Sequence, residues 1–351
     1  MKNTRFFLFA LLAAMSFTIA SCDDEDNAPK GAYEDGVFVV NEGNFLHADG
    51  SVTFINRSSG EVSNDLFGAV NAGRILGDVV QSMTVKGDMA YVVVNNSNKV
   101  EVVDANTFEA SYTLSDLKLP RYFITVGNKG YVTEWVSFVD KGRVSVVDLD
   151  SHTVTGTIVT DYGAEGIAEA NGKLFVSNNF TNTVSVINPA TLQVVQTLEV
   201  GDSPGVFVKD SQNKLWVICG GGSDANYNPL NNGRLVQIDA ATNTVSKTIE
   251  LNTNVSDNLA INKAGNQLFY YKGKSVYRVN TADTAAPSAP LLTESAAVSF
   301  YGIGIDPETD ILYVADSKAF QGNGTVFTYS TTGSAKGTFT AGIGPNNFVF
   351  K

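Results

Sequence analysis

The chain has few of the residues on which metal sites, disulfide frameworks and nucleic-acid binding depend. Its 351 residues include two cysteines and two histidines, which argues against a disulfide framework and against a metal site rich in histidine or cysteine. Positive charge is also scarce. Because 24 Lys and Arg stand against 36 Asp and Glu, giving a net charge of −12, a DNA or RNA partner is not expected.

The residues that are abundant indicate a β-protein. Hydrophobic residues make up 43% of the chain, which is enough for a sizeable core, and 32 glycines accompany 21 Phe and 13 Tyr. Aromatic and β-branched residues favour strands, and glycine favours the tight turns between them. The composition therefore predicts an all-β fold with many short connections.

Residues 1–21 have the pattern of a lipoprotein signal peptide. Lys2 and Arg5 precede an apolar run over residues 6–14, which is too short to span a bilayer as a helix. Small residues then lead to Cys22, which we expect to be acylated and to become the first residue of the mature protein. The alternative is an ordinary signal peptide with an incidental cysteine.

Residues 22–35 are expected to form an acidic tether between the lipid and the folded domain. Four acidic residues follow Cys22 directly, and this run resembles the surface-export signal of lipoproteins in some Gram-negative gut bacteria. The resemblance implies a lipid-anchored protein of the outer membrane that is exposed at the cell surface; a solvated acidic linker is the alternative. With Cys22 acylated, we expect Cys219 to be a buried free thiol.

One repeat accounts for the rest of the chain. Residues 89–114 (MAYVVVNNSNKVEVVDANTFEASYTL) align with residues 173–198 (KLFVSNNFTNTVSVINPATLQVVQTL), and each stretch reads as three strands joined by turns. Seven such units fit into residues 36–351, at about 45 residues each, which is the length of a four-stranded propeller blade. The fold prediction is a seven-bladed β-propeller; a count of six or eight blades is the alternative.

The ends of the chain predict how the ring closes. A short apolar strand precedes every unit except the first, and the chain ends on an unassigned strand over residues 345–351. We expect this terminal strand to become the innermost strand of the first blade, since closure removes open sheet edges. No amphipathic helix and no second domain are expected.

The two aligned stretches resemble the YVTN repeat of YncE-like seven-bladed propellers. The opening, VFVVNEGNFLHADGSVTFIN over residues 37–56, looks like the start of a narrower set of surface lipoproteins, the domain of unknown function 5074 type. That set is similar to the cobalamin-binding protein BtuG, which captures vitamin B12 above an outer-membrane transporter. The resemblance is specific for the fold and weak for the ligand, because propellers host many functions.

Loop lengths single out one face of the predicted propeller. Connections after the second and fourth strands of a blade share a face. Those after the second strand are expected to be long or moderate in blades one, three, five and seven, and short in the others, whereas the opposite face is expected to have uniformly tight turns. Variation on one face of a repeat array suggests a binding surface; neutral drift of loop length is the alternative.

The candidate ligand-binding residues are aromatic plates, amides and a few charged groups on that face, which suit a large flat ligand decorated with amides or hydroxyls. The long loops supply Asn44, Phe45, Trp135, Tyr227 and Phe320. The connections into the innermost strands supply Arg121, Tyr122, Tyr162, Glu165, Asn258, Tyr301 and Asn346. For any one of them, turn formation or edge packing is the alternative role.

The functional prediction is a non-catalytic, surface-exposed lipoprotein that binds cobalamin or a related corrinoid for an outer-membrane TonB-dependent transporter. A glycan- or protein-binding adhesion module is the first alternative, and a hydrolase or lyase is the second. No cofactor and no metal are expected. His47 and His152 should lie on opposite faces, so they cannot form a catalytic pair, although an acid pair such as Glu165 with Glu42 stays open.

Overall fold

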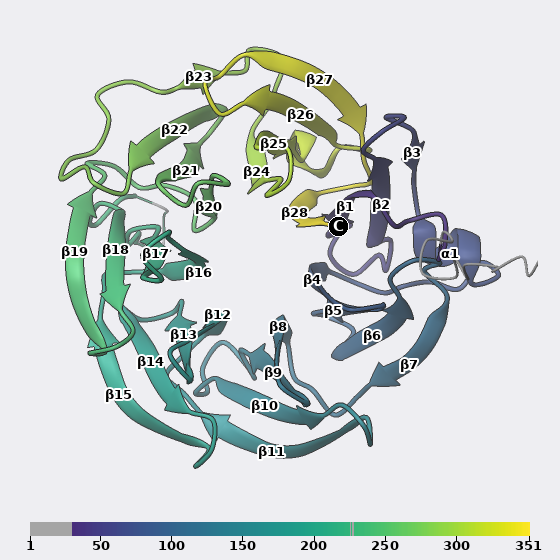
Figure 1. Cartoon of the computed structure of the whole chain (residues 1–351), viewed down its shortest axis with the longest axis horizontal. Helices are drawn as coiled ribbons and strands as arrows, with labels where there is room; N and C mark the ends of the chain where they lie inside the picture. The colour runs from purple at the N-terminus through teal and green to yellow at the C-terminus, as the bar shows by residue number, and fades with distance from the viewer. Residues whose placement is uncertain (1–29, 225, 227) are drawn as a thin grey trace, which may run out of the picture.

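The computed structural model describes residues 30–224, 226 and 228–351. Seven four-stranded antiparallel sheets surround a central axis (Figure 1), which confirms the predicted seven-bladed β-propeller. The expected signal peptide, the acylated Cys22 and the candidate Tyr227 lie outside the described residues. Within the described ranges, no helix combines the length and the apolar character needed to cross a membrane.

Each blade has four strands, which follow in order from the axis outward. Blade one has β28 (Pro345–Phe350), β1 (Gly36–Asn41), β2 (Ser51–Asn56) and β3 (Val62–Ser63); blade two has β4 (Val80–Lys86), β5 (Met89–Val94), β6 (Lys99–Asp104) and β7 (Ala110–Leu114); blade three has β8 (Pro120–Val126), β9 (Lys129–Glu134), β10 (Arg143–Asp148) and β11 (Thr153–Val159). Blade four has β12 (Ala164–Ala170), β13 (Lys173–Asn178), β14 (Thr183–Asn188) and β15 (Gln193–Glu199); blade five has β16 (Pro204–Lys209), β17 (Leu215–Cys219), β18 (Arg234–Asp239) and β19 (Thr244–Glu250). Blade six has β20 (Ala260–Ile261), β21 (Gln267–Lys272), β22 (Ser275–Asn280) and β23 (Leu292–Thr293); blade seven has β24 (Phe300–Ile305), β25 (Ile311–Asp316), β26 (Thr325–Ser330) and β27 (Ala335–Thr340).

The core is divided among the contacts between neighbouring blades. Seven hydrophobic clusters each join two adjacent blades. In β5, Val92 packs toward blade one, whereas Tyr91 and Val93 pack toward blade three. Successive side chains of a strand point to opposite faces of its sheet, so a central strand that is covered on both faces is apolar at every position. This explains the continuous apolar runs in the repeat.

The C-terminal strand closes the ring. β28 pairs antiparallel with β1, with Val39 opposite Phe348. Gly36 and Lys351 exchange both of their backbone hydrogen bonds, at 3.1 and 3.0 Å. Phe348 and the partly buried Phe350 pack against Tyr313 of blade seven, so the last strand joins the first blade to the last one. The predicted closure is confirmed.

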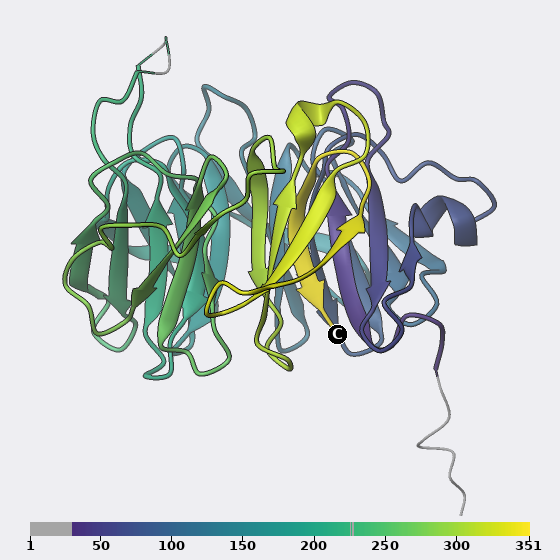
Figure 2. The same ribbon diagram turned by 90° about the horizontal axis from the view of Figure 1, so that it is seen from above.

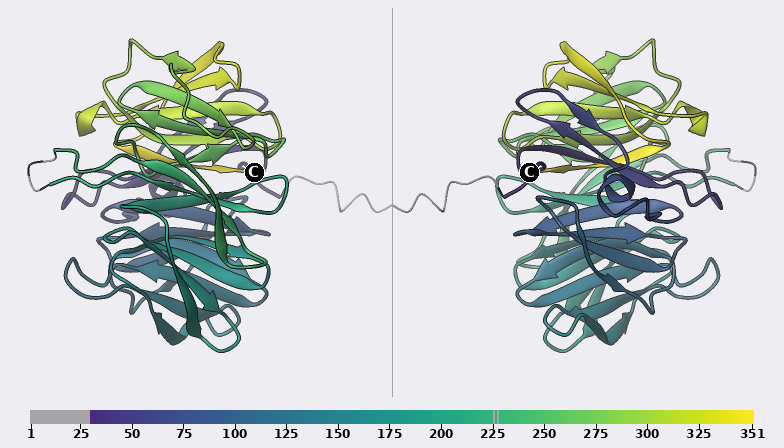
Figure 3. Two further views of the ribbon diagram at one scale, coloured as in Figure 1. Left: turned by 90° about the vertical axis from the view of Figure 1, so that its left-hand side faces the viewer. Right: turned by 90° about the vertical axis from the view of Figure 1, so that its right-hand side faces the viewer.

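The disc has two different faces (Figures 2 and 3). The loop face carries the connections that follow the second and fourth strands of each blade. Its longer connections are residues 42–50, 135–142, 220–233 and 317–324 after second strands, and residues 64–79 and 251–259 after fourth strands. The turn face carries the other connections and both ends of the described chain. There, the Lys30 ammonium lies 3.1 Å from the Asp88 carboxylate, and the Lys351 ammonium donates to the carbonyl of Ala105 at 3.0 Å.

Three features differ from expectation. A short helix, α1 (Leu66–Val70), buries Leu66 and Phe67 against blades one and two, so the expectation of no amphipathic helix is wrong there. A 3-10 turn, η2 (Lys318–Phe320), forms in the loop after β25. The turn face is not uniformly tight, because residues 281–291 connect β22 to β23 as a long segment in blade six.

Candidate functional site

A β-bulge recurs at the loop-face end of the innermost strand in six of the seven blades. In β8, for example, Pro120 pairs with Glu134 but the next paired residue is Phe123, opposite Val132. Bulges re-aim side chains, and here they supply residues to the axis of the ring. In blade six, where β20 is short, Asp257 precedes the strand at the matching position. We call the resulting set the axial ring: Gln81, Arg121, Glu165, Gly205, Asp257, Tyr301 and Asn346.

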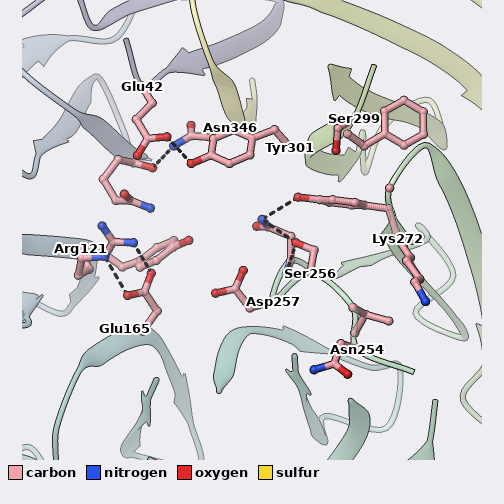
Figure 4. Close-up of a pocket in the computed structure, with 17 residues that line it drawn as sticks. Glu42, Arg121, Glu165, Asn254, Ser256, Asp257, Lys272, Ser299, Tyr301 and Asn346 are labelled. Atoms are coloured by element: carbon pink, nitrogen blue, oxygen red, sulfur yellow. Dashed lines mark hydrogen bonds and ion pairs between the residues drawn. The ribbon is translucent and has the colours of Figure 1, made fainter. Parts of the chain in front are cut away.

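The axial ring surrounds a pocket of about 450 Å³ at the loop-face end of the axis (Figure 4). All of its members except Gly205 line this pocket, together with Glu42, Tyr122, Tyr271 and residues 254–258. Gly205 does not line the pocket, because the backbone of Asp257 packs directly against it. A Cβ at position 205 would overlap the carbonyl oxygen of Asp257. The glycine therefore admits the chain segment that carries Asp257 to the axis. We call this cavity the axial pocket.

One wall of the axial pocket is a fixed ion pair. The Arg121 guanidinium donates twice to the Glu165 carboxylate, at 2.8 and 2.9 Å, and the Trp135 indole N–H donates to the same carboxylate at 2.7 Å. The guanidinium also stacks on the Trp135 ring, with 3.8 Å between its central carbon and the ring centroid. Bidentate pairs of this kind hold their geometry, so Trp135 is kept in a fixed orientation beside the pocket.

A second carboxyl group, that of Glu42, lies on the same side of the pocket as the ion pair (Figure 4). The Tyr301 hydroxyl donates to the Glu42 carboxylate, which reaches the axis from the loop after β1. Burial raises the pKa of Glu42, and the Tyr301 hydrogen bond and the Arg121 charge only partly offset this effect. Burial likewise raises the pKa of Glu165, against the opposing effect of Arg121. Glu165 and Glu42, whose pairing the sequence left open, thus both line the pocket, but each has its own partner.

Asp257 is the least satisfied of the three carboxyl groups. Figure 4 shows it pointing into the open centre of the pocket, and its one side-chain hydrogen bond, from the Asn179 amide, is long at 3.4 Å. Burial raises its pKa, and the Arg121 charge opposes this only in part. The pocket lining therefore has three carboxyl groups, one guanidinium and the Lys272 ammonium, so its acidic side chains outnumber its basic ones.

The substitution Asp257→Asn is expected to stabilise the protein at neutral pH. The raised pKa means that the folded protein binds this proton more tightly than the unfolded chain does. Charging the folded carboxyl therefore costs stability as the pH rises above the unfolded value of about 3.9. The variant's melting temperature should exceed that of the wild type at pH 7.5, and the difference should shrink toward pH 4.5.

Asp148, on the turn face, is the matched control for this titration. Backbone and side-chain hydrogen bonds from Ser151 lower the pKa of Asp148, so its charged form is favoured in the folded state. Asp148→Asn should therefore lower the melting temperature at pH 7.5, with a smaller effect as the pH falls. Equal responses of the two variants to pH would contradict this account of the axial pocket.

A second pocket, of about 420 Å³, adjoins the first and has five aromatic side chains in its lining. It shares Glu42, Arg121 and Tyr301 with the axial pocket. Its rings, which we call the aromatic rim, come from blades one, three and seven: Phe45, Trp135, Phe138, Tyr301 and Phe320. Phe180 extends this rim, stacking on Phe138 at a centroid distance of 5.9 Å. The two pockets together place aromatic plates beside a polar floor.

Most of the sequence-predicted site residues meet at these two pockets. Arg121, Tyr122, Glu165, Asn258, Tyr301 and Asn346 line the axial pocket, and Asn44, Phe45, Arg121, Trp135, Tyr301 and Phe320 line the aromatic pocket. Tyr162 lines neither; it is 38% exposed and its ring lies 5.8 Å from the Lys141 ammonium. Its position after the fourth strand of blade three holds it outside the aromatic rim. His47 and His152 lie on opposite faces, as predicted, and Cys219 is a buried free thiol.

The sequence prediction missed Gln81, Asp257 and Tyr271. A detectable signal existed for the first two, because they occupy the same position of the repeat as Arg121, Glu165, Tyr301 and Asn346. Aligning the innermost strands residue by residue would have selected the whole axial ring. Tyr271 is the penultimate residue of β21 in blade six and carries no comparable signal; its hydroxyl accepts a long hydrogen bond from the Asn258 amide at 3.4 Å.

Exposed apolar side chains also gather on the loop face. Of the described large apolar residues that are exposed, three lie on outermost strands of the blades. The others lie in loop-face connections: Phe45, Leu46, Ile75, Phe138, Val139, Tyr162, Phe180, Leu230 and Val298. Exposed apolar side chains on one face are a common feature of interaction sites when they form a contiguous patch. Among the described residues, no group of three or more His, Cys, Asp and Glu side chains is arranged to hold a metal ion.

Comparison with known proteins identifies a family and a fold. A family model described as Domain of unknown function (DUF5074) matches residues 35–344. No curated protein sequence matches the chain significantly. The structure is similar to a quinonprotein alcohol dehydrogenase-like protein of Bacteroides thetaiotaomicron (TM-score 0.71, 15% identity, 91% of this chain and 78% of that one). It is also similar to a periplasmic gluconolactonase of Pseudomonas aeruginosa (0.65, 14%, 90% and 99%) and to a functionally unknown protein of Desulfotomaculum acetoxidans (0.66, 13%, 90% and 98%). Identities this low show a common fold alone.

Proposed function

The chain belongs to the DUF5074 family, and on that premise we propose that it is a surface-exposed lipoprotein that captures cobalamin or a related corrinoid. The observation that carries the proposal is the pairing of an aromatic pocket with a polar axial pocket on one face of the ring. A corrinoid is a broad, flat macrocycle whose edge bears carboxamides. Its ring would lie against the aromatic rim, while its edge groups would reach the axial pocket.

The position of the chain's described start supports a membrane-anchored arrangement. Lys30 lies on the turn face, opposite both pockets, because it contacts Asp88 in the turn between β4 and β5. If Cys22 carries the lipid, the eight residues from 23 to 30 can span at most about 28 Å. An anchor on the turn face leaves the pockets unobstructed by the membrane. The apolar residues that surround the pockets would then meet an outer-membrane TonB-dependent transporter when the ligand is handed over.

The proposed role is non-catalytic. Both oxygens of the Glu165 carboxylate accept hydrogen bonds from Arg121 or Trp135, and one oxygen of the Glu42 carboxylate accepts from Tyr301. The gluconolactonase and the dehydrogenase-like protein share only the fold with this chain, so their names do not assign it a reaction.

A glycan is the second candidate ligand. It is favoured by the stacked Phe138 and Phe180 rings, which are 72% and 38% exposed and could stack on sugars.

The ligand is tested by gel filtration with cyanocobalamin, whose visible absorbance follows it through the column. We expect the absorbance to migrate with the protein. Absorbance that elutes only at the position of free cyanocobalamin, combined with retention of the protein on a glycan affinity column, would favour the glycan candidate instead.

The lipid anchor is tested by the substitution Cys22→Ser. Acylation requires the cysteine thiol, so the variant should leave the membrane fraction and appear in soluble fractions, whereas Cys219→Ser should not change the distribution. Because the thiol of Cys219 is buried, with its pKa raised to about 12 by burial, it is a suitable control. A Cys22→Ser protein that still sediments with the outer membrane would refute the lipid anchor as the sole attachment.

A further inference from the structure

The axial pocket contains buried hydrogen-bond acceptors that have no donor. The Oε1 atom of Gln81 and the Oδ1 atom of Asn346 are buried without a partner, and each residue is only 8% exposed. The Oδ1 atom of Asn254, on the same pocket lining, is also unpartnered. A buried acceptor without a donor is costly, and folded proteins rarely keep one unless a ligand or water satisfies it.

The orientation of the Asn346 amide is fixed by its neighbours. Its nitrogen donates to two backbone carbonyls, those of Gln81 at 3.1 Å and Val80 at 3.4 Å. Carbonyls only accept, so a flipped amide would place oxygen against oxygen. The Oδ1 atom must therefore be the free end of this side chain.

Two carboxyl groups of the pocket also present oxygen atoms that can accept hydrogen bonds. The carboxylate of Asp257 points into the pocket with one long hydrogen bond, and Glu42 accepts from Tyr301 on one of its oxygens. The cations are already engaged: Arg121 is paired with Glu165, and the Lys272 ammonium donates to Thr253 at the rim. The pocket thus offers unpartnered acceptors and more acidic than basic side chains, whereas its two cations are already engaged.

We propose that the axial pocket recognises a ligand through a neutral N–H donor, a primary carboxamide, and that it rejects the corresponding carboxylate. The carboxamide nitrogen supplies hydrogens to the acceptors of Gln81, Asn346 and Asp257. A carboxylate brings no hydrogen and adds a negative charge beside Glu42 and Asp257. The inference deepens the proposed function and rests on it for the identity of the ligand: one edge carboxamide of the corrinoid enters the axial pocket.

Two buried glutamines allow a matched test. Gln81 and Gln237 are both 8% exposed, but in Gln237, in blade five, both ends of the amide have a partner: it donates to Asp210 at 2.9 Å and accepts from Ser246 at 2.9 Å. Methionine has a similar shape and lacks the amide. Gln81→Met should weaken cyanocobalamin binding at least tenfold with little change in melting temperature, whereas Gln237→Met should lower the melting temperature and leave binding within twofold.

The ligand side of the test uses cyanocobalamin derivatives in which one peripheral carboxamide is hydrolysed to a carboxylate. At least one of these monocarboxylates should bind tenfold or more weakly than cyanocobalamin. If every monocarboxylate binds within twofold of the parent, and Gln81→Met binds like the wild type, the donor inference is wrong while the proposed function stands.

A second experiment tests the same inference without a corrinoid. Acetamide and acetate have the same shape and differ in the donor, and saturation-transfer NMR detects the weak binding of either one. Acetamide should give a signal with the wild type that is lost in Gln81→Met, and acetate should give none. That result upholds the inference even if cyanocobalamin does not bind and the proposed function falls. A signal from acetate equal to that from acetamide would overturn it, as would a calcium-dependent rise in melting temperature that Gln81→Met abolishes.

Discussion

Deletion of residues 345–351 is expected to abolish cooperative folding of the propeller. The deletion removes β28, which supplies the innermost strand of blade one and packs Phe348 and Phe350 against Tyr313 of blade seven. The edge of β1 would lose its partner, and the contact between the first and last blades would open. The loss should reach several kcal/mol, a large part of the roughly 5–15 kcal/mol that stabilises a typical protein.

A point substitution in the same strand separates closure from mere truncation. Phe348→Ala should cost about 3 kcal/mol, near the lower end for a buried aromatic residue because the ring is not completely covered. Phe45→Ala, on an exposed ring of the loop face, should cost less than about 0.5 kcal/mol. Urea unfolding of the three variants provides the comparison. An unchanged midpoint in the deleted protein would show that the ring does not depend on its C-terminal strand.

The second large effect is expected at the aromatic rim. Trp135→Ala and Tyr301→Ala should each weaken cyanocobalamin binding by about 1–3 kcal/mol, or roughly 5- to 150-fold, because a few aromatic residues dominate most binding surfaces. Trp135 also holds Glu165, so Trp135→Phe is the informative companion: it keeps an aromatic plate but removes the hydrogen bond to that carboxylate. If Trp135→Phe loses less affinity for cyanocobalamin than Trp135→Ala does, most of the effect comes from the aromatic ring and not from the hydrogen bond to Glu165.

The control for these variants lies on the turn face. His152 stacks on Tyr112 of the neighbouring blade, with 3.5 Å between ring centroids. It is an aromatic contact of the same general kind, placed on the face away from both pockets. His152→Ala should leave the affinity unchanged. If binding survives the loss of Trp135 and Tyr301 but falls with His152→Ala, the ligand binds the turn face.

The sequence predicted the fold well because each blade repeats the same physical pattern. Strands such as β5 and β13 are apolar at consecutive positions. The unassigned strand at residues 345–351 fitted only one place, the innermost position of blade one. The alternation of long and short loops was also visible in the spacing of strands. The helix α1 was missed because five residues are too few for a helical period to stand out against loop sequence.

The site was harder to predict because it depends on bulges. A bulge shifts the alternation of a strand by one residue, so sequence periodicity alone cannot say that Gln81 faces the axis and not a neighbouring blade. Asp257 reaches the axis only because Gly205 leaves room for its backbone. Trp135 and Phe45 were easier to predict, since large aromatic residues in long loops on one face have few structural reasons to be there.

The most direct test of the account is calorimetric titration of cyanocobalamin into the purified protein at micromolar concentration. We predict one saturable binding event per chain, with heat that is strongly reduced in Trp135→Ala and unchanged in His152→Ala. No heat of binding with the folded wild-type protein, at concentrations where its melting transition is intact, would contradict the proposal that this propeller captures a corrinoid.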